Sequence, residues 1–505
     1  MRLPRTSIVA QDADGLRLGK EKMQRAIFPV VVAVVAWLPV SHGRDHRPPA
    51  VTPIALHADN PHYFHWRGRP TILITSGEHY GAVMNLDFDY RKYLDALTAD
   101  GLNYTRIFSG AYVEPLGAFK IERNTLAPAA GRFTAPWART TTAGYANGGT
   151  KFDLSRWDDT YFRRLHDFAA YASARGIVVE LSLFCPMYED MQWQLSPMNA
   201  TNNVNGIGKI ARTDVYAMDR NGSLQAVQEA LTRKLVTELN GFDNLFFEIC
   251  NEPYFGGVTM AWQHRIADVI AETERALPAR HLIAQNIANE SAHITDPHPA
   301  VSIFNFHYAT PPFAVGMNYG LGKVIGDDET GFRGTADAPY RTEGWEFILA
   351  GGGLYNNLDY SFVAGEEAGT FAFPPTQPGG GGIAFRAQMK TLRDFINGFD
   401  FIRMRPDISP IKGGVPVGAR VQALVEPGRA MALYLRRPVT RAPETLTPPF
   451  AADLMIDFPE GEWLATWVDP VSGKPTQARS IRGGGIRTLS SPPFETDIAL
   501  RIIRQ

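Results

Sequence analysis

The hydrophobic pattern alternates between two periods through most of the chain. Short runs of β-branched and apolar residues, typical of buried strands, are separated by longer segments with helical spacing. This alternation predicts βα units around a parallel sheet, and eight strands predict a (β/α)8 TIM barrel. The expected strands are residues 71–75, 102–108, 177–184, 245–249, 282–286, 301–306, 323–326 and 353–360.

Helices are expected between most of these strands. Three of them, 88–100, 159–175 and 224–240, stop at a glycine just before the next strand. Glycine is common there because it adopts the left-handed conformation that ends a helix. Further helices are expected at 259–276, 340–350 and 385–397.

Two connections are much longer than a simple turn, residues 110–156 after the second strand and 185–221 after the third. In a barrel, the segments that follow strands build the active-site face. We therefore expect these two loops to wall a cleft.

From about residue 411 the pattern changes to short alternating runs separated by Gly and Pro turns, which predicts a small all-β sandwich. Its expected strands are 430–436, 454–458, 462–468 and 498–503. The predicted division of the chain is an N-terminal extension and signal peptide (1–43), a linker (44–53), the catalytic barrel (54–408) and the C-terminal β-sandwich (409–505).

The N-terminal segment resembles an export signal. A basic stretch at 20–25 precedes an apolar run at 26–40 and the small residues around Gly43. The run is shorter than the roughly 20 residues of a membrane-spanning helix, which disfavours a permanent anchor. We expect a secreted or periplasmic protein whose natural start is Met23.

Composition narrows the choice of partner. The 505 residues carry a formal net charge of -2, which gives no general attraction to nucleic acid or anionic membranes. Cys185 and Cys250 are the only cysteines, so a disulfide scaffold and a Cys-rich metal site are excluded, and we expect free thiols. The sequence contains no His-Glu-x-x-His, Gly-x-Ser-x-Gly or Walker motif.

The fourth expected strand runs directly into Asn251-Glu252-Pro253. At this position the tripeptide resembles the acid/base motif of the clan A, cellulase-like glycoside hydrolases. The resemblance implies that Glu252 is the acid/base and that Asn251 binds a sugar hydroxyl.

The clan places its nucleophile at the end of the seventh strand, where Glu329 is the matching residue. Asp328 is adjacent, and Glu366 and Glu367 follow the eighth strand, so they remain alternatives. If Glu329 is not catalytic, the alternative interpretation is that residues 327–331 form a solvent-exposed acidic turn.

Further residues near strand ends are candidates for the substrate site. Arg106 resembles the clan's second-strand arginine, which would hold the nucleophile ionised. His307 and Tyr308 resemble its His/Tyr pair at the sixth strand, although the spacing differs. Sugar-binding candidates also include Glu78 and His79 after the first strand, and possible stacking platforms are Tyr254, Trp345, Tyr188 and Trp193.

These residues predict a retaining glycoside hydrolase that acts on a poly- or oligosaccharide with two glutamates and without metal or cofactor. Burial and nearby negative charge are expected to keep Glu252 protonated. One alternative is a non-catalytic carbohydrate-binding protein on a barrel scaffold, and another is a lyase or transglycosylase using the same cleft. The C-terminal part, with Trp463 and Trp467, resembles a domain type named for collagen binding, and its expected role is packing against the barrel.

Overall fold

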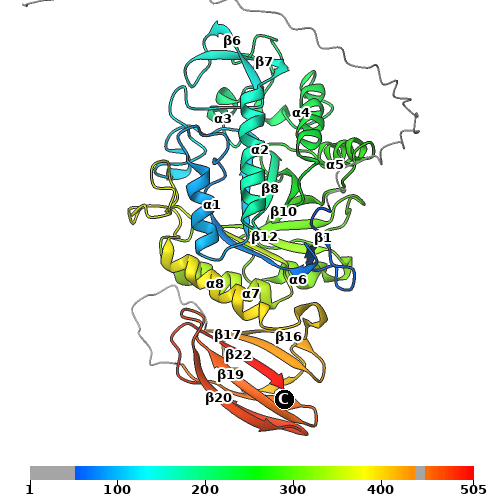
Figure 1. Ribbon diagram of the computed structural model, residues 1–505, viewed down its shortest axis with the longest axis vertical. Helices are drawn as coiled ribbons and strands as arrows, with labels where there is room; N and C mark the ends of the chain where they lie inside the picture. The colour runs from blue at the N-terminus through cyan, green and yellow to red at the C-terminus, as the bar shows by residue number, and fades with distance from the viewer. Residues whose placement is uncertain (1–51, 438–449) are drawn as a thin grey trace, which may run out of the picture. The chain divides into compact units, whose positions relative to one another are not determined.

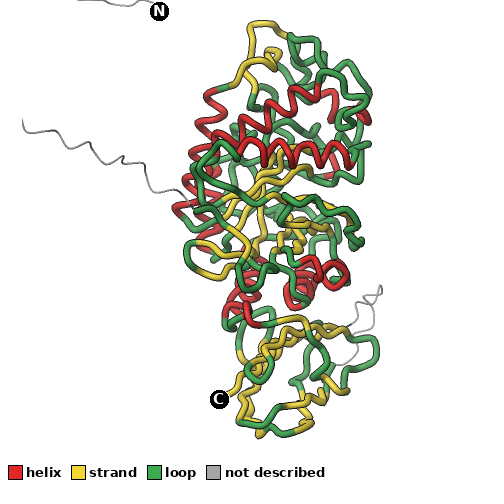
Figure 2. Tube along the Cα trace, turned by 90° about the vertical axis from the view of Figure 1, so that its right-hand side faces the viewer, coloured by secondary structure: helices red, strands yellow, loops and turns green. Residues whose placement is uncertain are grey.

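The computed structural model describes residues 52–437 and 450–505, and its central element is an eight-stranded parallel sheet surrounded by helices (Figures 1 and 2). The predicted signal peptide and most of the predicted linker lie outside the described residues. All eight expected strands are present, which confirms the barrel. They are β4 (Leu73–Gly77), β5 (Tyr104–Phe108), β8 (Val178–Phe184), β9 (Leu245–Cys250), β10 (Ile283–Asn289), β11 (Ile303–His307), β12 (Val324–Thr330) and β13 (Leu354–Leu358).

A side chain completes the ring of strands. Backbone pairing runs in the order β4-β13-β12-β11-β10-β9-β8-β5. Between β4 and β5, Asn103 accepts a hydrogen bond from the Ile74 amide (3.1 Å) and donates one to the Ile72 carbonyl (2.8 Å). The first and second strands are thus held together without a continuous ladder.

The six expected helices are present, a further short helix at Phe313–Asn318 was not foreseen, and aspartate side chains cap two of the helix starts. Asp89 and Asp158 each accept hydrogen bonds from two backbone amides in the first turn of the helix that follows. Gly101 and Gly176 have the expected positive φ angles, whereas Gly241 does not. The helices are α1 (Tyr90–Ala99), α2 (Asp159–Ala174), α4 (Leu224–Leu239), α5 (Met260–Glu274), α6 (Phe313–Asn318), α7 (Asp337–Leu349) and α8 (Ile383–Asn397).

Several elements were not foreseen. A three-stranded sheet of β1 (Ala55–Leu56), β2 (Phe64–Trp66) and β3 (Arg69–Thr71) packs its apolar side chains against the beginnings of the barrel strands. The long loop after β5 contains a hairpin of β6 (Trp137–Ala143) and β7 (Thr150–Trp157), and α3 (Asp190–Leu195) lies in the loop after β8. The two loops predicted to wall a cleft therefore have their own internal structure.

The C-terminal region is all-β, as predicted, with a shared apolar core between two antiparallel sheets. One sheet has the order β14-β16-β17-β22-β19-β20, and the other β15-β18-β21. The strands are β14 (Arg405–Pro406), β15 (Ile411–Gly413), β16 (Arg420–Glu426), β17 (Ala430–Arg436), β18 (Asp453–Phe458), β19 (Glu462–Val468), β20 (Pro475–Arg482), β21 (Gly485–Ser490) and β22 (Asp497–Arg504).

The sandwich contacts the barrel through α7. Trp345 stacks on Tyr434 of β17 with ring centroids 5.3 Å apart, and Arg341 pairs with Asp497 at 2.7 Å. The buried Glu346 carboxylate accepts hydrogen bonds from both Arg420 and Arg436. These buried contacts hold the sandwich against α7 of the barrel.

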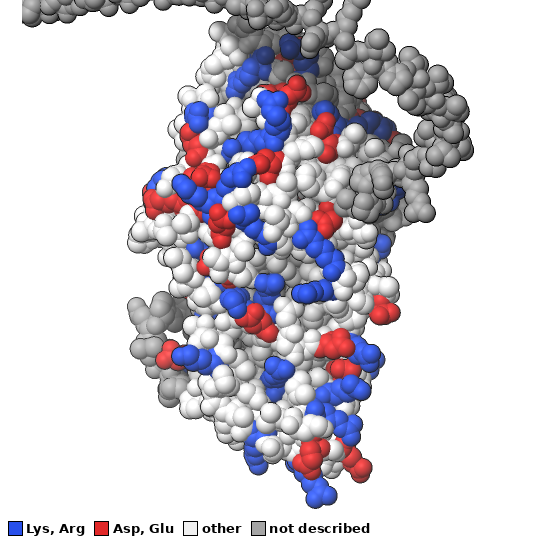
Figure 3. All heavy atoms as spheres, in the orientation of Figure 1, with Lys and Arg blue, Asp and Glu red and all other residues white. Residues whose placement is uncertain are grey.

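The surface agrees with the near-neutral composition. In Figure 3, basic and acidic side chains are interspersed over the described residues of the face shown. In the part of the chain that the structure describes, no helix is both long enough and apolar enough to cross a membrane.

Candidate active site

A pocket of about 370 Å³ opens at the carboxyl ends of the barrel strands. Its lining comes from the segments that follow seven of the eight strands, which is the face where barrel enzymes place their active sites. The lining residues are His79, Tyr80, Phe108, Glu114, Phe119, Leu126, Cys185, Tyr188, Asn251, Glu252, Phe255, Asn289, Tyr308, Glu329 and Phe332.

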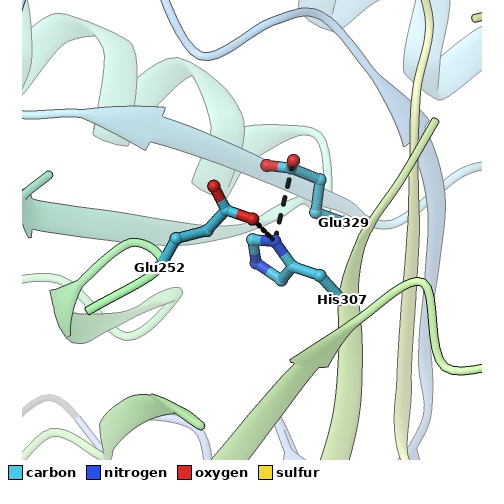
Figure 4. A group of neighbouring side chains, drawn as sticks. All are labelled: Glu252, His307 and Glu329. Atoms are coloured by element: carbon cyan, nitrogen blue, oxygen red, sulfur yellow. Dashed lines mark hydrogen bonds and ion pairs between the residues drawn. The ribbon is translucent and has the colours of Figure 1, made fainter. Parts of the chain in front are cut away.

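Glu252 and Glu329 face each other across this pocket, with His307 between them (Figure 4). Glu252 follows the end of β9, and Glu329 lies on β12. One oxygen of each carboxylate and a ring nitrogen of His307 lie within 4.8 Å of one another. His307 Nδ1 is 3.1 Å from Glu252 Oε1 and 3.6 Å from Glu329 Oε1.

Glu329 lies within a barrel strand, not in a loop. β12 extends beyond the expected residue 326 to Thr330, because its parallel neighbours β11 and β13 continue to pair with it. Tyr80 and Tyr308 donate hydrogen bonds to Glu329 at 2.9 and 2.7 Å. Glu329 is therefore a fixed, buried carboxylate, which contradicts the reading of a solvated acidic turn.

Arg106 lies beneath the pocket and is fully buried among carboxylates. Its Nη1 donates to Glu329 Oε2 at 3.4 Å, and its Nη2 donates to Glu248 Oε2 and to Asn251 Oδ1 at 2.5 and 2.8 Å. Burial raises the pKa of Glu248 to about 7. Burial would also raise the pKa of Asp328, but Arg106 and His307 lower it below its ordinary value. Arg106 thus supplies the positive charge expected of it.

The protonation of Glu252 differs from the expectation. Burial by itself raises the pKa of a carboxyl group, but the His307 hydrogen bond and charge, with hydroxyl donors Tyr188 (2.5 Å) and Tyr254 (3.1 Å), lower the pKa of Glu252 below its ordinary value. Burial also disfavours charge on His307, yet Glu329 and Asp328 raise the pKa of His307 well above its ordinary value. Both shifts favour an ionised Glu252 beside a protonated His307.

Backbone strain is concentrated around the pocket. Positive φ angles occur at Tyr80 (60°), Phe119 (53°), Glu252 (36°), Tyr308 (54°) and Phe332 (58°), all of which line it. Such conformations cost about 1–3 kcal/mol each and persist where the surrounding structure enforces them, often at functional sites. The strained backbone conformations therefore lower the stability of the fold and orient these side chains toward the pocket.

Two predicted substrate residues do not reach the pocket. Trp345 is fully buried on α7 against Tyr434, because the sandwich covers that face of the helix, so its prediction as a stacking platform is wrong. Glu78 turns its carboxylate to the backbone amides of Gly81 and Ala82, at 3.0 Å each, and fixes the turn after β4 instead. Burial raises the pKa of Glu78 to about 7.

Of the other predicted site residues, some line or border the pocket and others are held elsewhere. His79, Tyr308 and Asn251 line the pocket, Tyr254 contacts Glu252 from its edge, and Trp193 is buried in the loop after β8. The alternative nucleophiles are held elsewhere: Glu366 pairs with Arg123, and Glu367 accepts hydrogen bonds from the Gly365 and Asp89 amides. Both cysteines are free and buried, as expected, and Cys185 forms part of the pocket wall.

Sequence reasoning missed several residues of the pocket. Tyr80 directly follows the Glu78-His79 pair, and its place just after a strand end was the available signal. Glu114 and the aromatic residues Phe119, Phe255 and Phe332 lie inside loops, where no periodic pattern places a side chain. Tyr188 was expected to stack on sugar, but its hydroxyl donates to Glu252.

Two carboxylate clusters have the spacing of metal ligands, Glu252 and Glu329 with His307, and Glu180 and Glu248 with Asp328. In the first, tyrosine hydroxyls and Arg106 already engage the two glutamates. In the second, the Arg106 guanidinium supplies the balancing cation. The donors present therefore fit a pair of reacting carboxylates and a buried ion-pair network.

The fold and this pair of glutamates define a class, the (β/α)8 barrels with two carboxylates at strand ends. Solved structures share the architecture. One described as a glycoside hydrolase has a TM-score of 0.60 at 12% identity, covering 90% of this chain and 97% of its own. A glycoside hydrolase family 5 protein from Bacteroides vulgatus ATCC 8482 has a TM-score of 0.59 at 13% identity, covering 90% and 93%.

Identities this low show the shared fold. No protein-family model matches the sequence, and no curated protein is significantly similar to it.

Proposed function

We propose that this protein is a retaining glycoside hydrolase that acts on a poly- or oligosaccharide. The observation that carries the proposal is the facing pair Glu252 and Glu329, with carboxylate oxygens within 4.8 Å in a pocket at the strand ends. Retaining enzymes hold their carboxyl groups about 5–5.5 Å apart, whereas inverting enzymes need about 6.5–9.5 Å to admit a water molecule. The shared fold with known glycoside hydrolases supports the same conclusion.

In the first step, the Glu329 carboxylate attacks the anomeric carbon while Glu252 gives a proton to the leaving oxygen. A bound sugar excludes water, and a drier pocket disfavours the separated charges of Glu252 and His307. The proton can then pass along the 3.1 Å contact from His307 Nδ1 to Glu252 Oε1. In the second step, Glu252 takes a proton from water, which displaces Glu329 and releases the sugar.

The proposal is tested by the stereochemistry of the first product. Two displacements at one carbon restore its configuration, so NMR of the early reaction mixture should show the anomer of the substrate before mutarotation. The opposite anomer as first product would contradict the two-step mechanism. Product analysis also separates a hydrolase from a lyase, which leaves an unsaturated sugar, and from a transglycosylase.

His307 should set the pH dependence of the reaction. In the proposed mechanism the His307 imidazolium supplies the proton that Glu252 donates, and the pKa of His307 lies well above its ordinary value, so the pair keeps this proton beyond the pH at which a carboxyl group alone would lose it. In His307→Gln only the Glu252 carboxyl can hold the proton, so the basic limb of the kcat/KM profile should move to lower pH, with roughly a 10- to 100-fold loss of rate from the missing hydrogen bonds. His166→Gln, at a surface pair with Glu238, is the matched control and should change neither. An unmoved basic limb would show that His307 does not govern Glu252.

A non-catalytic carbohydrate-binding role remains the second candidate, and it predicts glycan binding without turnover. Export through the N-terminal segment stays a prediction, as does the likeness of the sandwich to the domain named for collagen binding. The contacts of α7 with Tyr434, Asp497 and Arg436 support a packing role for the sandwich.

A further inference from the structure

One wall of the pocket carries polar groups that the proposed chemistry does not use. Glu114 is 4% exposed, and its carboxylate accepts hydrogen bonds from Tyr112 (3.1 Å) and Asn124. His79 lies beside it, with Nε2 3.5 Å from Glu114 Oε2. Both residues line the pocket, and their neighbours hold Glu114 in one orientation.

The ion pair with Glu114 leaves the hydrogen-bonding capacity of the buried His79 unfilled. Among the described residues, neither of its ring nitrogens has a hydrogen bond, although the side chain is only 10% exposed. Leaving a buried polar group without a hydrogen bond lowers stability. Hydroxyl groups of a ligand in the pocket would satisfy His79 and the free lone pairs of Glu114.

Aromatic rings surround much of the pocket mouth. Phe119 contacts Tyr188 (5.3 Å between centroids) and Phe332 (6.4 Å), Tyr188 contacts Phe255 (5.8 Å), and Phe332 contacts Tyr360 (6.5 Å). These residues come from the segments after β5, β8, β9, β12 and β13. The ring continues on the side of β10 and β11, because Tyr308 contacts Phe332 (6.3 Å) and Tyr254 contacts Phe255 (5.0 Å) and donates a hydrogen bond to Asn289.

Polar contacts also join two loops on the side of the pocket near Phe119, and we call the contacts of Glu122 and Arg123 with the loop after β13 the clasp. Arg123 pairs with Glu366 at 2.7 Å and donates to the Ala364 carbonyl, and the Glu122 amide donates to Gln377 Oε1 at 3.1 Å. The clasp joins the loop after β5 to the loop after β13. A polysaccharide chain that crossed the pocket on this side would have to separate these contacts.

Charge adds a restriction on the sugar. The lining contains the carboxylates Glu114, Glu252 and Glu329 and no lysine or arginine. A uronic acid or sulfated sugar would meet like charge without a guanidinium or ammonium group to bind it. A neutral sugar offers hydroxyl donors to the same carboxylates.

From these observations we infer that the pocket binds the end of a neutral saccharide chain and releases its terminal unit, with Glu114 and His79 binding the terminal hydroxyl groups. This inference rests on the proposed glycosidase function and adds an exo mode of action to it. Glu114 is then a specificity residue that senses the chain end.

The test uses neutral oligosaccharides tagged with a fluorophore at the reducing end, together with 4-nitrophenyl glycosides of the same sugars. Wild-type protein should shorten each tagged chain by one unit at a time and release a monosaccharide. Glu114→Gln should lower kcat/KM roughly 10- to 100-fold, since it weakens buried hydrogen bonds to a charged group. Arg123→Ala should open the clasp and yield internal cuts.

Arg132→Ala is the matched control, because Arg132 lies in the same loop and forms an exposed pair with Asp87. Its product pattern should equal that of the wild type. Internal cuts by wild-type protein would overturn the exo inference and leave the glycosidase function standing. A preference for chains ending in a uronic acid would overturn the neutral-sugar part, and no cleavage of any probe would overturn both proposals.

Discussion

Glu329→Ala should lower kcat by about 10⁴-fold or more, the scale of losing a residue that forms a covalent intermediate. The reason is that Glu329, held by Tyr80, Tyr308 and Arg106, is the nucleophile of the proposed mechanism. The rate is measured with an activated aryl glycoside, and circular dichroism confirms that the variant is folded.

Azide distinguishes the two glutamates. In Glu329→Ala, azide can enter the space of the lost carboxylate and yield a glycosyl azide of inverted configuration. In Glu252→Ala, azide should attack the glycosyl enzyme and yield the retained configuration. Glu462→Gln, on an exposed strand position of the sandwich, is the control and should keep full activity. Wild-type rates in Glu329→Ala would place the nucleophile elsewhere.

Glu346→Ala should lower the free energy of unfolding by about 3–5 kcal/mol, the typical cost of breaking a buried ion pair from one side. Glu346 is 1% exposed and is the carboxylate partner of Arg420 and Arg436, which come from the sandwich. Its removal leaves the nearly buried Arg436 side chain without that partner. Denaturant unfolding followed by fluorescence measures the loss.

A matched surface change shows whether burial is the cause. Asp394→Ala breaks an exposed pair with Lys390 on α8 and should cost about 0.5 kcal/mol or less. Arg436→Ala, which leaves Glu346 paired with Arg420, should cost less than Glu346→Ala. Equal effects of the Glu346 and Asp394 variants would mean that the interface contributes little to stability.

The scaffold was predicted well from the sequence because a parallel strand that is buried on both faces appears in the sequence as a continuous apolar run. All eight strands were found within a few residues, and Glu252 and Glu329 were placed at strand ends where the structure has them. Other elements were missed: β1 to β3 are only two or three residues long, the β6–β7 hairpin is irregularly paired and β20 is mostly exposed, so their patterns carry little signal. β16 was missed although it is seven residues long and pairs regularly with β17.

Trp345 and Glu78 show where sequence position misleads. Both follow barrel strands, and either could have pointed into the pocket. The direction of Trp345 was decided by the sandwich, more than 80 residues further along the chain at Tyr434. The Glu78 carboxylate instead accepts hydrogen bonds from the amides of its own turn, because an unpaired backbone donor in a buried turn lowers stability.

The sequence by itself determined the barrel and the small β region, because periodicity is a local property of a chain, and the two glutamates followed from the resemblance of their strand ends to those of the clan A glycoside hydrolases. Only the tertiary structure decided the protonation partner of Glu252, the Glu114 and His79 wall and the clasp between loops. These depend on side chains that are distant in sequence and meet in a dry space, where burial and neighbouring charge set the pKa and the shape of the pocket.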